Sequence, residues 1–128
     1  MYLKFYRTEW DVYHDFWQVR YTPAEADKVL RKLSRHFKVK CYWEFTKYKN
    51  GNASYIWNTI KLPKQNIALA MIIHELGHLL AMKKYQHIGH NKYLKRANKI
   101  IFRYAIKFLP IEILYRTNNQ LLLEYRED

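Results

Sequence analysis

The segment from residue 67 to residue 82 limits the possible folds of this chain more than any other part of the sequence. It is apolar on nearly every side of a helix, and its polar side chains are His74, Glu75 and His78. A helix of this composition is buried nearly all round. Polar groups inside a core are costly unless they have partners. The sequence therefore predicts a central helix whose polar groups are satisfied either by hydrogen bonds within the core or by a bound metal ion.

The order His74-Glu75-Leu76-Gly77-His78 favours the metal ion. Two residues four apart on a helix differ by only about 40° in direction and about 6 Å along the axis. Both imidazoles can therefore bind one ion from the same face. Glu75 points about 100° away from His74, which suits contact with a water on that ion. Histidine ligands with a neighbouring glutamate base are the H-E-x-x-H arrangement of zinc hydrolases.

A catalytic zinc ion usually has three protein ligands and a water, so this motif needs one more ligand. His87 and His90 follow shortly after it in the sequence. Gly89 favours a loop that turns the chain back, and Asn91 is a suitable N-cap for the next helix. We predict His90 as the third ligand. The alternative ligands are His87, Glu112 and Glu124. Ordinary structural or surface roles are expected for His14 and His36.

The motif at 74–78 and the sequence at 89–94, with a histidine twelve residues after the motif, resemble the SprT-like (Spartan-type) zinc metallopeptidases. The resemblance covers about residues 25 to 108 and is specific at the histidines. It implies a zincin-like peptidase domain that binds Zn²⁺ and acts on DNA-bound proteins. The ligands so implied are His74, His78 and His90, and the implied catalytic base is Glu75. The chain departs from the family at Asn91, which replaces a glycine, at Leu94, which replaces an aromatic residue, and in lacking a cysteine-rich zinc ribbon.

The remaining pattern predicts an α+β fold in a single domain that spans residues 1–128. Thr22, Pro23 and Glu25 form a capping box at the start of a helix. Residues that favour strands occur in two runs, which we expect to form a short antiparallel sheet through a turn at Asn50-Gly51. We expect this helix and sheet to pack on the H-E-x-x-H helix and a second long helix. The predicted elements are a helix from 22 to 37, strands at 38–46 and 53–62, the central helix from about 65 to 84, a long helix from about 91 to 108 and a partly helical segment at 111–125. The predicted stops are Pro63 and Pro110, and residues 1–20 are ambiguous.

Composition favours a folded, intracellular protein. The chain is 49% hydrophobic and 17% aromatic, which argues against disorder. Cys41 is the only cysteine, so no intramolecular disulfide forms, and this suits a reducing compartment. The N-terminal sequence has no apolar region typical of a signal peptide, and no run of about 18 residues is free of charge. We therefore expect no transmembrane segment.

The net charge of +12 is the second informative feature. A charge of this size favours anionic partners. The basic residues of the helix at 92–108 fall largely on one side, and apolar residues fill much of the other. The resemblance to the SprT-like family, which acts on DNA-bound proteins, favours a phosphate-contacting surface for DNA on the basic side. A solvated helix face and a membrane-surface helix are the alternatives. The candidate nucleic-acid-binding residues are Lys92, Arg96, Lys99, Arg103 and Lys107.

Together these features predict a small zinc-dependent endopeptidase, with DNA-associated proteins as its expected substrates. Glu75 would take a proton from the attacking water and pass it to the leaving nitrogen. The strand at 53–62 would bind an extended peptide by strand addition. The candidate oxyanion stabilisers are Tyr85, His87 and Tyr93. Two alternatives stay open, namely a nucleic-acid-binding module with a structural or inactive zinc site, and a membrane-surface zinc hydrolase.

Overall fold

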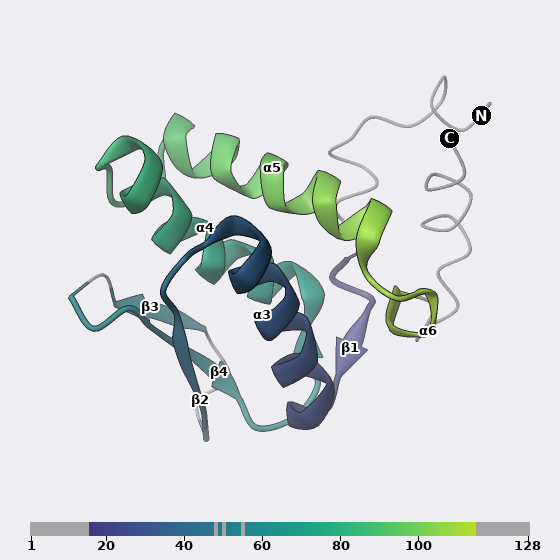
Figure 1. Ribbon diagram of the computed structural model, residues 1–128. Coiled ribbons are helices and arrows are strands. Elements are labelled where there is room, and N and C mark those ends of the chain that lie inside the picture. Colours follow the sequence, from purple (N-terminus) through teal and green to yellow (C-terminus); the bar gives the residue numbers. More distant parts are fainter. Residues whose placement is uncertain (1–15, 48, 50, 55, 115–128) are drawn as a thin grey trace.

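The computed structural model describes residues 16–47, 49, 51–54 and 56–114, which form an α+β fold (Figure 1). The helices are α3 (Pro23–Phe37), α4 (Leu69–Tyr85), α5 (Lys92–Phe108) and the short α6 (Ile111–Leu114). The strands are β1 (Arg20–Tyr21), β2 (Tyr42–Thr46), β3 (Asn52–Ser54), β4 (Thr59–Pro63) and β5 (Ile67–Ala68). The expected mixture of helices and short strands is confirmed. Most of the predicted elements at 1–20 and 111–125 lie outside the described residues.

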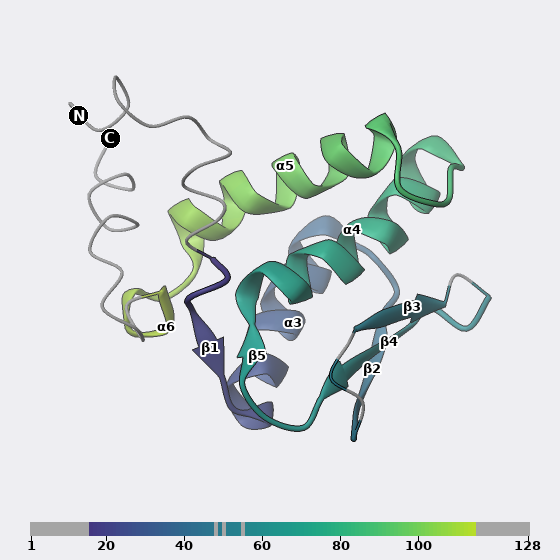
Figure 2. The same ribbon diagram turned by 180° about the vertical axis from the view of Figure 1, so that it is seen from behind.

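Helix α4 lies at the centre, where it packs against α5, α3 and the sheet (Figures 1 and 2). Its buried positions run from Leu69 to Ala81, as its apolar sequence predicts. The helix begins at Leu69 rather than near residue 65 because residues 67–68 form β5, which pairs antiparallel with β1. The first amides of α4, those of Leu69 and Ala70, donate to carbonyl oxygens of the segment before β1, at 3.0 and 3.3 Å. The segment before β1 thus takes the place of a side-chain cap.

Helix α3 begins with the predicted capping box. The backbone N–H of Thr22 donates to the Glu25 carboxylate at 2.8 Å, and the N–H of Glu25 donates to Thr22 Oγ1 at 3.3 Å. At the other end of the helix, Lys83 Nζ of α4 donates to the carbonyl oxygens of Phe37 and Lys38 at 3.2 and 2.5 Å. A cation there satisfies terminal carbonyls and opposes the negative end of the helix dipole. This contact fixes α3 against the C-terminal half of α4.

Helix α5 also begins and ends where the sequence predicts. The side-chain oxygen of Asn91 accepts the backbone N–H groups of Tyr93 and Leu94, at 2.9 and 3.3 Å. The helix ends at Phe108, two residues before Pro110. Its apolar stripe packs along α4 and so closes one side of the core. The buried members of this stripe are Leu94, Ala97, Ile101, Phe102, Ala105 and Ile106.

The sheet differs from the prediction. The run expected as one strand at 53–62 is divided into β3 and β4, which form an antiparallel pair joined by a turn. Strand β2 pairs parallel to β4, so the order is β2-β4-β3 and the sheet is mixed rather than antiparallel. The run at 53–62 contains neither glycine nor proline to mark that turn, and the backbone reverses at Asn58, which has a φ of 50°. Strand β4 ends at Pro63, as predicted. The edge position of β3 places it beside α4.

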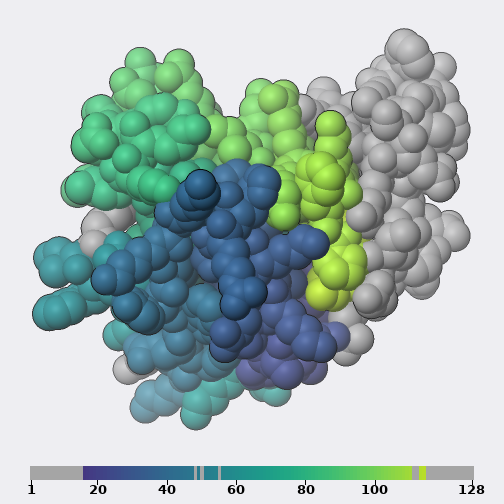
Figure 3. Space-filling view, in the orientation of Figure 1, coloured from purple at the N-terminus to yellow at the C-terminus, as the bar shows by residue number. Residues whose placement is uncertain are grey.

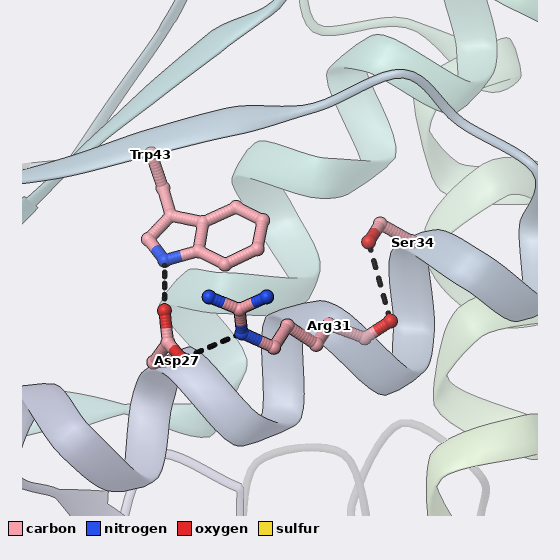
Figure 4. Close-up of polar contacts among 4 residues, drawn as sticks. All are labelled: Asp27, Arg31, Ser34 and Trp43. Carbon is pink, nitrogen blue, oxygen red and sulfur yellow. Dashed lines mark hydrogen bonds and ion pairs between the residues drawn. The ribbon is translucent and has the colours of Figure 1, made fainter.

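A polar contact joins α3 to the outer strand of this sheet (Figure 4). Trp43 Nε1 of β2 donates to Asp27 Oδ1 at 2.9 Å, and Arg31 Nε donates to Asp27 Oδ2 at 2.8 Å. The Arg31 guanidinium also lies 5.7 Å from the centre of the Trp43 ring. These contacts with Arg31 are the main reason that the pKa of Asp27 is lowered. The contact orients the sheet on α3 and leaves the opposite edge, β3, facing the site described next.

Candidate metal centre

Two histidines of α4 point their Nε2 atoms at each other from successive turns. The His74 Nε2 to His78 Nε2 distance is 3.2 Å, and the rings are nearly perpendicular at 87°. His78 is buried with 7% exposure, and His74 is half-buried. The four-residue spacing thus places both imidazoles on one face of the helix, as the sequence predicts.

The loop from 86 to 91 brings a third histidine to the same point. Gln86 ends α4 in the left-handed conformation with a φ of 53°, and Gly89 has a φ of 90°, a conformation that favours glycine. Asn91 Nδ2 donates to the Ile88 carbonyl at 3.1 Å, so the residue that caps α5 also holds the loop. As a result His90 Nε2 lies 3.3 Å from His74 Nε2.

These three histidines lie close enough to bind one metal ion. All of their ligating nitrogens lie within 4.8 Å of one another. A tetrahedral zinc ion with Zn–N bonds of about 2.0–2.1 Å holds its ligand nitrogens about 3.3–3.4 Å apart. The separations of 3.2 Å from His74 to His78 and 3.3 Å from His74 to His90 therefore suit such an ion. His90 is exposed, so one side of the cluster remains open.

The electrostatics of α4 keep its two histidines in the neutral form that a metal requires. Burial, together with the charges of the neighbouring His74 and His90, lowers the pKa of His78 to about 4. Burial and the neighbouring His90 also lower the pKa of His74. At neutral pH both imidazoles therefore offer a lone pair without first losing a proton.

Glu75 lies in the same cleft as the histidines. The cleft has a volume of about 400 Å³ and is lined by Gly51, Asn52, Ala53, His74, Glu75, His78, Ile88, Gly89 and His90. Glu75 is only 7% exposed, and this burial raises the pKa of its carboxyl to about 7. A carboxyl that titrates near neutral pH can both accept and return a proton. The position of Glu75 beside the three histidines thus suits a general base.

The chain passes very close to Glu75 at Gly51, which the sequence marks only as part of a turn. A β-carbon on Gly51 would lie 2.7 Å from Glu75 Oε2 and 3.0 Å from Met71 Cγ. Contacts this short are not tolerated without movement, so glycine is what allows β3 to approach the carboxylate. No feature of the sequence indicates this approach, because the contact joins positions 24 residues apart whose relation depends on the sheet order.

The predicted alternative ligand, His87, lies elsewhere. Its ring stacks on Tyr93 with centroids 4.0 Å apart, and Tyr93 also contacts Tyr85 at 5.2 Å. None of these three residues is among those that line the cleft. His36 stacks on Tyr104 at 3.7 Å, also outside the cleft. Outside the described residues lie His14, Glu124 and the side chain of Glu112.

The basic residues predicted on α5 are all exposed, on the side of that helix away from α4. They are Lys92, Arg96, Lys99, Arg103 and Lys107. Lys92 and Arg96 also lie over the Tyr93 ring, at 5.2 and 5.6 Å from its centre. Within the described part of the chain, no helix combines the length and the apolar character needed to cross a membrane.

Comparison with known proteins gave no match to any family model, any curated protein or any solved structure.

Proposed function

We propose that this protein is a zinc-dependent endopeptidase. The observation that carries the proposal is the convergence of three histidine nitrogens beside a buried glutamate in one open cleft. The H-E-x-x-H motif and the resemblance to the SprT-like family support the same activity. The lone Cys41 suits an intracellular protein, in which thiols stay reduced.

The ligand set favours a catalytic over a structural site. Structural zinc sites are usually closed by four protein ligands, whereas catalytic sites have three and keep one position for water. His74, His78 and His90 are the only cluster of this kind in the described part of the chain. The open cleft beside them leaves room for a substrate. Imidazole also suits copper, iron and nickel, so the assignment of zinc rests on its tetrahedral geometry and on the motif.

The residues of the chain have distinct roles in the proposed reaction. When bound, zinc would lower the pKa of a water toward about 7 and polarise the scissile carbonyl. Glu75 takes the proton of the attacking water and returns it to the leaving nitrogen. The outer edge of β3 pairs with the substrate backbone, because β3 lines the cleft and pairs only with β4 among the described strands.

The proposal is tested by stripping the purified protein with a chelator and reloading it with zinc. An unfolded protein substrate should be cleaved by the reloaded sample and not by the stripped sample. Failure of the zinc-loaded protein to cleave unfolded proteins or peptides, with or without DNA, would refute the peptidase assignment.

We propose DNA association as a second function, because the exposed side of α5 carries the five basic residues named above. The membrane alternative is less well supported, since the apolar side of α5 packs in the core and Leu109 is fully buried. DNA binding would place the peptidase near DNA-associated proteins, which are then its natural substrates.

A further inference from the structure

Two large apolar side chains are exposed on the turn between β3 and β4. Ile56 is 83% exposed and Trp57 is 73% exposed, more than any other large apolar residue described. The turn is held by its neighbours, since Thr59 Oγ1 donates to the Trp57 carbonyl at 2.9 Å and the Trp57 N–H donates to Ser54 Oγ at 3.5 Å. It projects from the side of the molecule, beyond the end of β3 (Figures 1 and 3). The turn therefore exposes an apolar surface to solvent, and hydrogen bonds define its backbone conformation.

This turn continues directly from the wall of the cleft. Strand β3 is the edge strand, and its first two residues, together with Gly51 just before it, line the cleft beside Glu75. The number of residues between the cleft and the turn limits the distance between them. Gly51 and Ile56 are five positions apart in the sequence, so at no more than about 3.6 Å per residue they are at most about 18 Å apart. An extended peptide bound along β3 would therefore reach the turn within a few residues.

The direction of such a peptide decides which of its residues meet the turn. Antiparallel pairing is slightly more stable and commoner than parallel pairing. Strand β3 runs from the cleft toward the turn, so an antiparallel peptide runs from the turn toward the cleft. The residues near Ile56 and Trp57 are then those on the amino side of the bond beside Glu75.

We propose that Ile56 and Trp57 form a substrate subsite that binds a large apolar side chain about three to five residues before the cleaved bond. The inference rests on the proposed peptidase function and specifies its substrate class. Apolar residues are usually buried in folded proteins, so this preference selects unfolded or partly unfolded chains. Burial of the peptide side chain against an indole and an aliphatic chain supplies the affinity.

The test uses zinc-loaded full-length protein and random peptides of about 14 residues, long enough to span both the cleft and the turn. Cleavage sites are read by mass spectrometry. The native protein should prefer leucine, phenylalanine or tryptophan at the stated positions on the amino side. The Trp57→Ala and Ile56→Ala variants should cleave without that preference. Phe108→Ala is the matched control, since it removes another exposed aromatic residue, 55% exposed, at the C-terminal end of α5.

The size of the preference is measured with two peptides that are identical except that one has leucine and the other has serine at the preferred position. The ratio of their kcat/KM values should be about tenfold for the native protein and close to one for Trp57→Ala. No preference in the native protein, a preference on the carboxyl side only, or an unchanged ratio in Trp57→Ala would overturn the subsite. Binding to anionic vesicles that is lost in Trp57→Ala, with peptide selectivity unchanged, would assign the turn to a membrane surface instead.

A binding assay separates this inference from the peptidase proposal. If the native protein cleaves nothing, the peptidase proposal fails, but labelled peptides can still be titrated into zinc-loaded Glu75→Gln protein. Adding Trp57→Ala to that variant should weaken binding of the leucine peptide by about tenfold and leave the serine peptide unaffected. Equal affinities for the leucine peptide with and without Trp57 would overturn the subsite whatever the result of the cleavage assay.

Discussion

His90 is exposed, unlike the two histidines of α4, and its position depends on the loop that precedes α5. The loop is defined by two left-handed residues, Gln86 and Gly89, and by both hydrogen-bonding ends of the Asn91 side chain. The backbone conformations of Gln86 and Gly89 and the hydrogen bonds of the Asn91 side chain therefore position His90 beside the two histidines of α4. The sequence pointed to this loop through Gly89 and Asn91. It could not separate His90 from His87 by spacing alone.

The first prediction concerns those two histidines. His90→Ala should reduce bound zinc severely, as should His74→Ala and His78→Ala, because each removes one of three converging ligands. His87→Ala should retain about one zinc per chain, since its ring stacks on Tyr93. Elemental analysis of protein purified without chelator measures this. Zinc should also raise the melting temperature of the His87 variant but not that of the ligand variants.

If His87→Ala loses zinc while His90→Ala keeps it, the roles assigned to these residues are wrong. Equal retention by both variants would point to a ligand outside the described residues, such as Glu124.

The second prediction follows from the buried carboxyl of Glu75 in the metal-free protein. Burial raises its pKa from the ordinary 4.5 to about 7. The protonated carboxyl therefore contributes stability that is fully present below pH 4.5 and is lost as the pH rises through 7. Glu75→Gln lacks this dependence. The free energy of unfolding of the variant should thus exceed that of the native protein increasingly between those pH values, by up to about 3 kcal/mol.

Urea unfolding of chelator-treated protein at a series of pH values measures this difference. His78, whose lowered pKa acts in the opposite direction, is present in both proteins and cancels. Zinc should shrink the difference, because a nearby cation favours the ionised carboxylate. A difference that is independent of pH in the metal-free proteins would show that Glu75 is not desolvated in the way described.

At the scale of elements, the helices were predictable and the sheet was not. Each helix carries local signals: a capping box at Thr22, an apolar run in α4, and Asn91 and Pro110 around α5. The sheet depends on pairing between distant segments. No local sequence signal indicates the parallel pairing of β2 with β4, and the turn between β3 and β4 contains neither glycine nor proline. The predicted hairpin at Asn50-Gly51 was therefore wrong, although Gly51 does matter through its approach to Glu75.

The third prediction concerns the packing of α5 on α4. A β-carbon on Gly77 would lie 1.9 Å from Asn98 Oδ1. That oxygen is buried and has no hydrogen-bond partner among the described residues. Glycine inside a helix usually has such a packing reason. Gly77→Ala should reduce the free energy of unfolding by about 1–2 kcal/mol, because the inserted methyl group overpacks the interface.

The double variant Gly77→Ala with Asn98→Ala should recover at least the native stability in the same unfolding measurement. It removes both the clash and an unpaired polar atom, and alanine is the better helix former. If the effects of the two substitutions on the free energy of unfolding are strictly additive, the alanine at position 77 does not clash with Asn98.

For the molecule as a whole, the net charge is +12, and five of the basic residues lie on the exposed side of α5. Non-specific attraction to nucleic acid is expected of almost any protein with this charge. A defined interface differs from it in depending on particular residues. Three basic residues on the exposed face of α3, Lys28, Lys32 and Arg35, provide a control of equal charge.

The fourth prediction uses that control. The logarithm of the DNA affinity should fall with the logarithm of salt concentration, with a slope of about −0.9 for each phosphate contact. Changing Arg96, Lys99 and Arg103 to glutamine should flatten the slope by up to about three contacts and leave zinc content unchanged. The control replacement of Lys28, Lys32 and Arg35 should have a smaller effect. Equal effects of the two triple variants would show that net charge alone binds DNA.

Most of the site was predictable from the sequence, but its surroundings were not. The motif spacing predicts the positions of His74, His78 and Glu75 because a helix fixes them relative to one another. Gly51 and Ile88 line the cleft, and the exposed turn at Ile56-Trp57 lies beyond it; the positions of all four depend on the tertiary packing of the sheet and the loops. The motif therefore predicts the chemistry, whereas the proposed subsite could be inferred only from the structure.

We propose that Glu75 acts as the base beside a metal held by three histidines. The most direct test of this role compares peptide hydrolysis by native protein and by Glu75→Gln, each shown to carry the same amount of zinc. The variant preserves size and polarity and removes the basic group. Its kcat should be at least about 100-fold lower than that of the native protein. Comparable hydrolysis by the two proteins at equal zinc content would show that Glu75 is not the base.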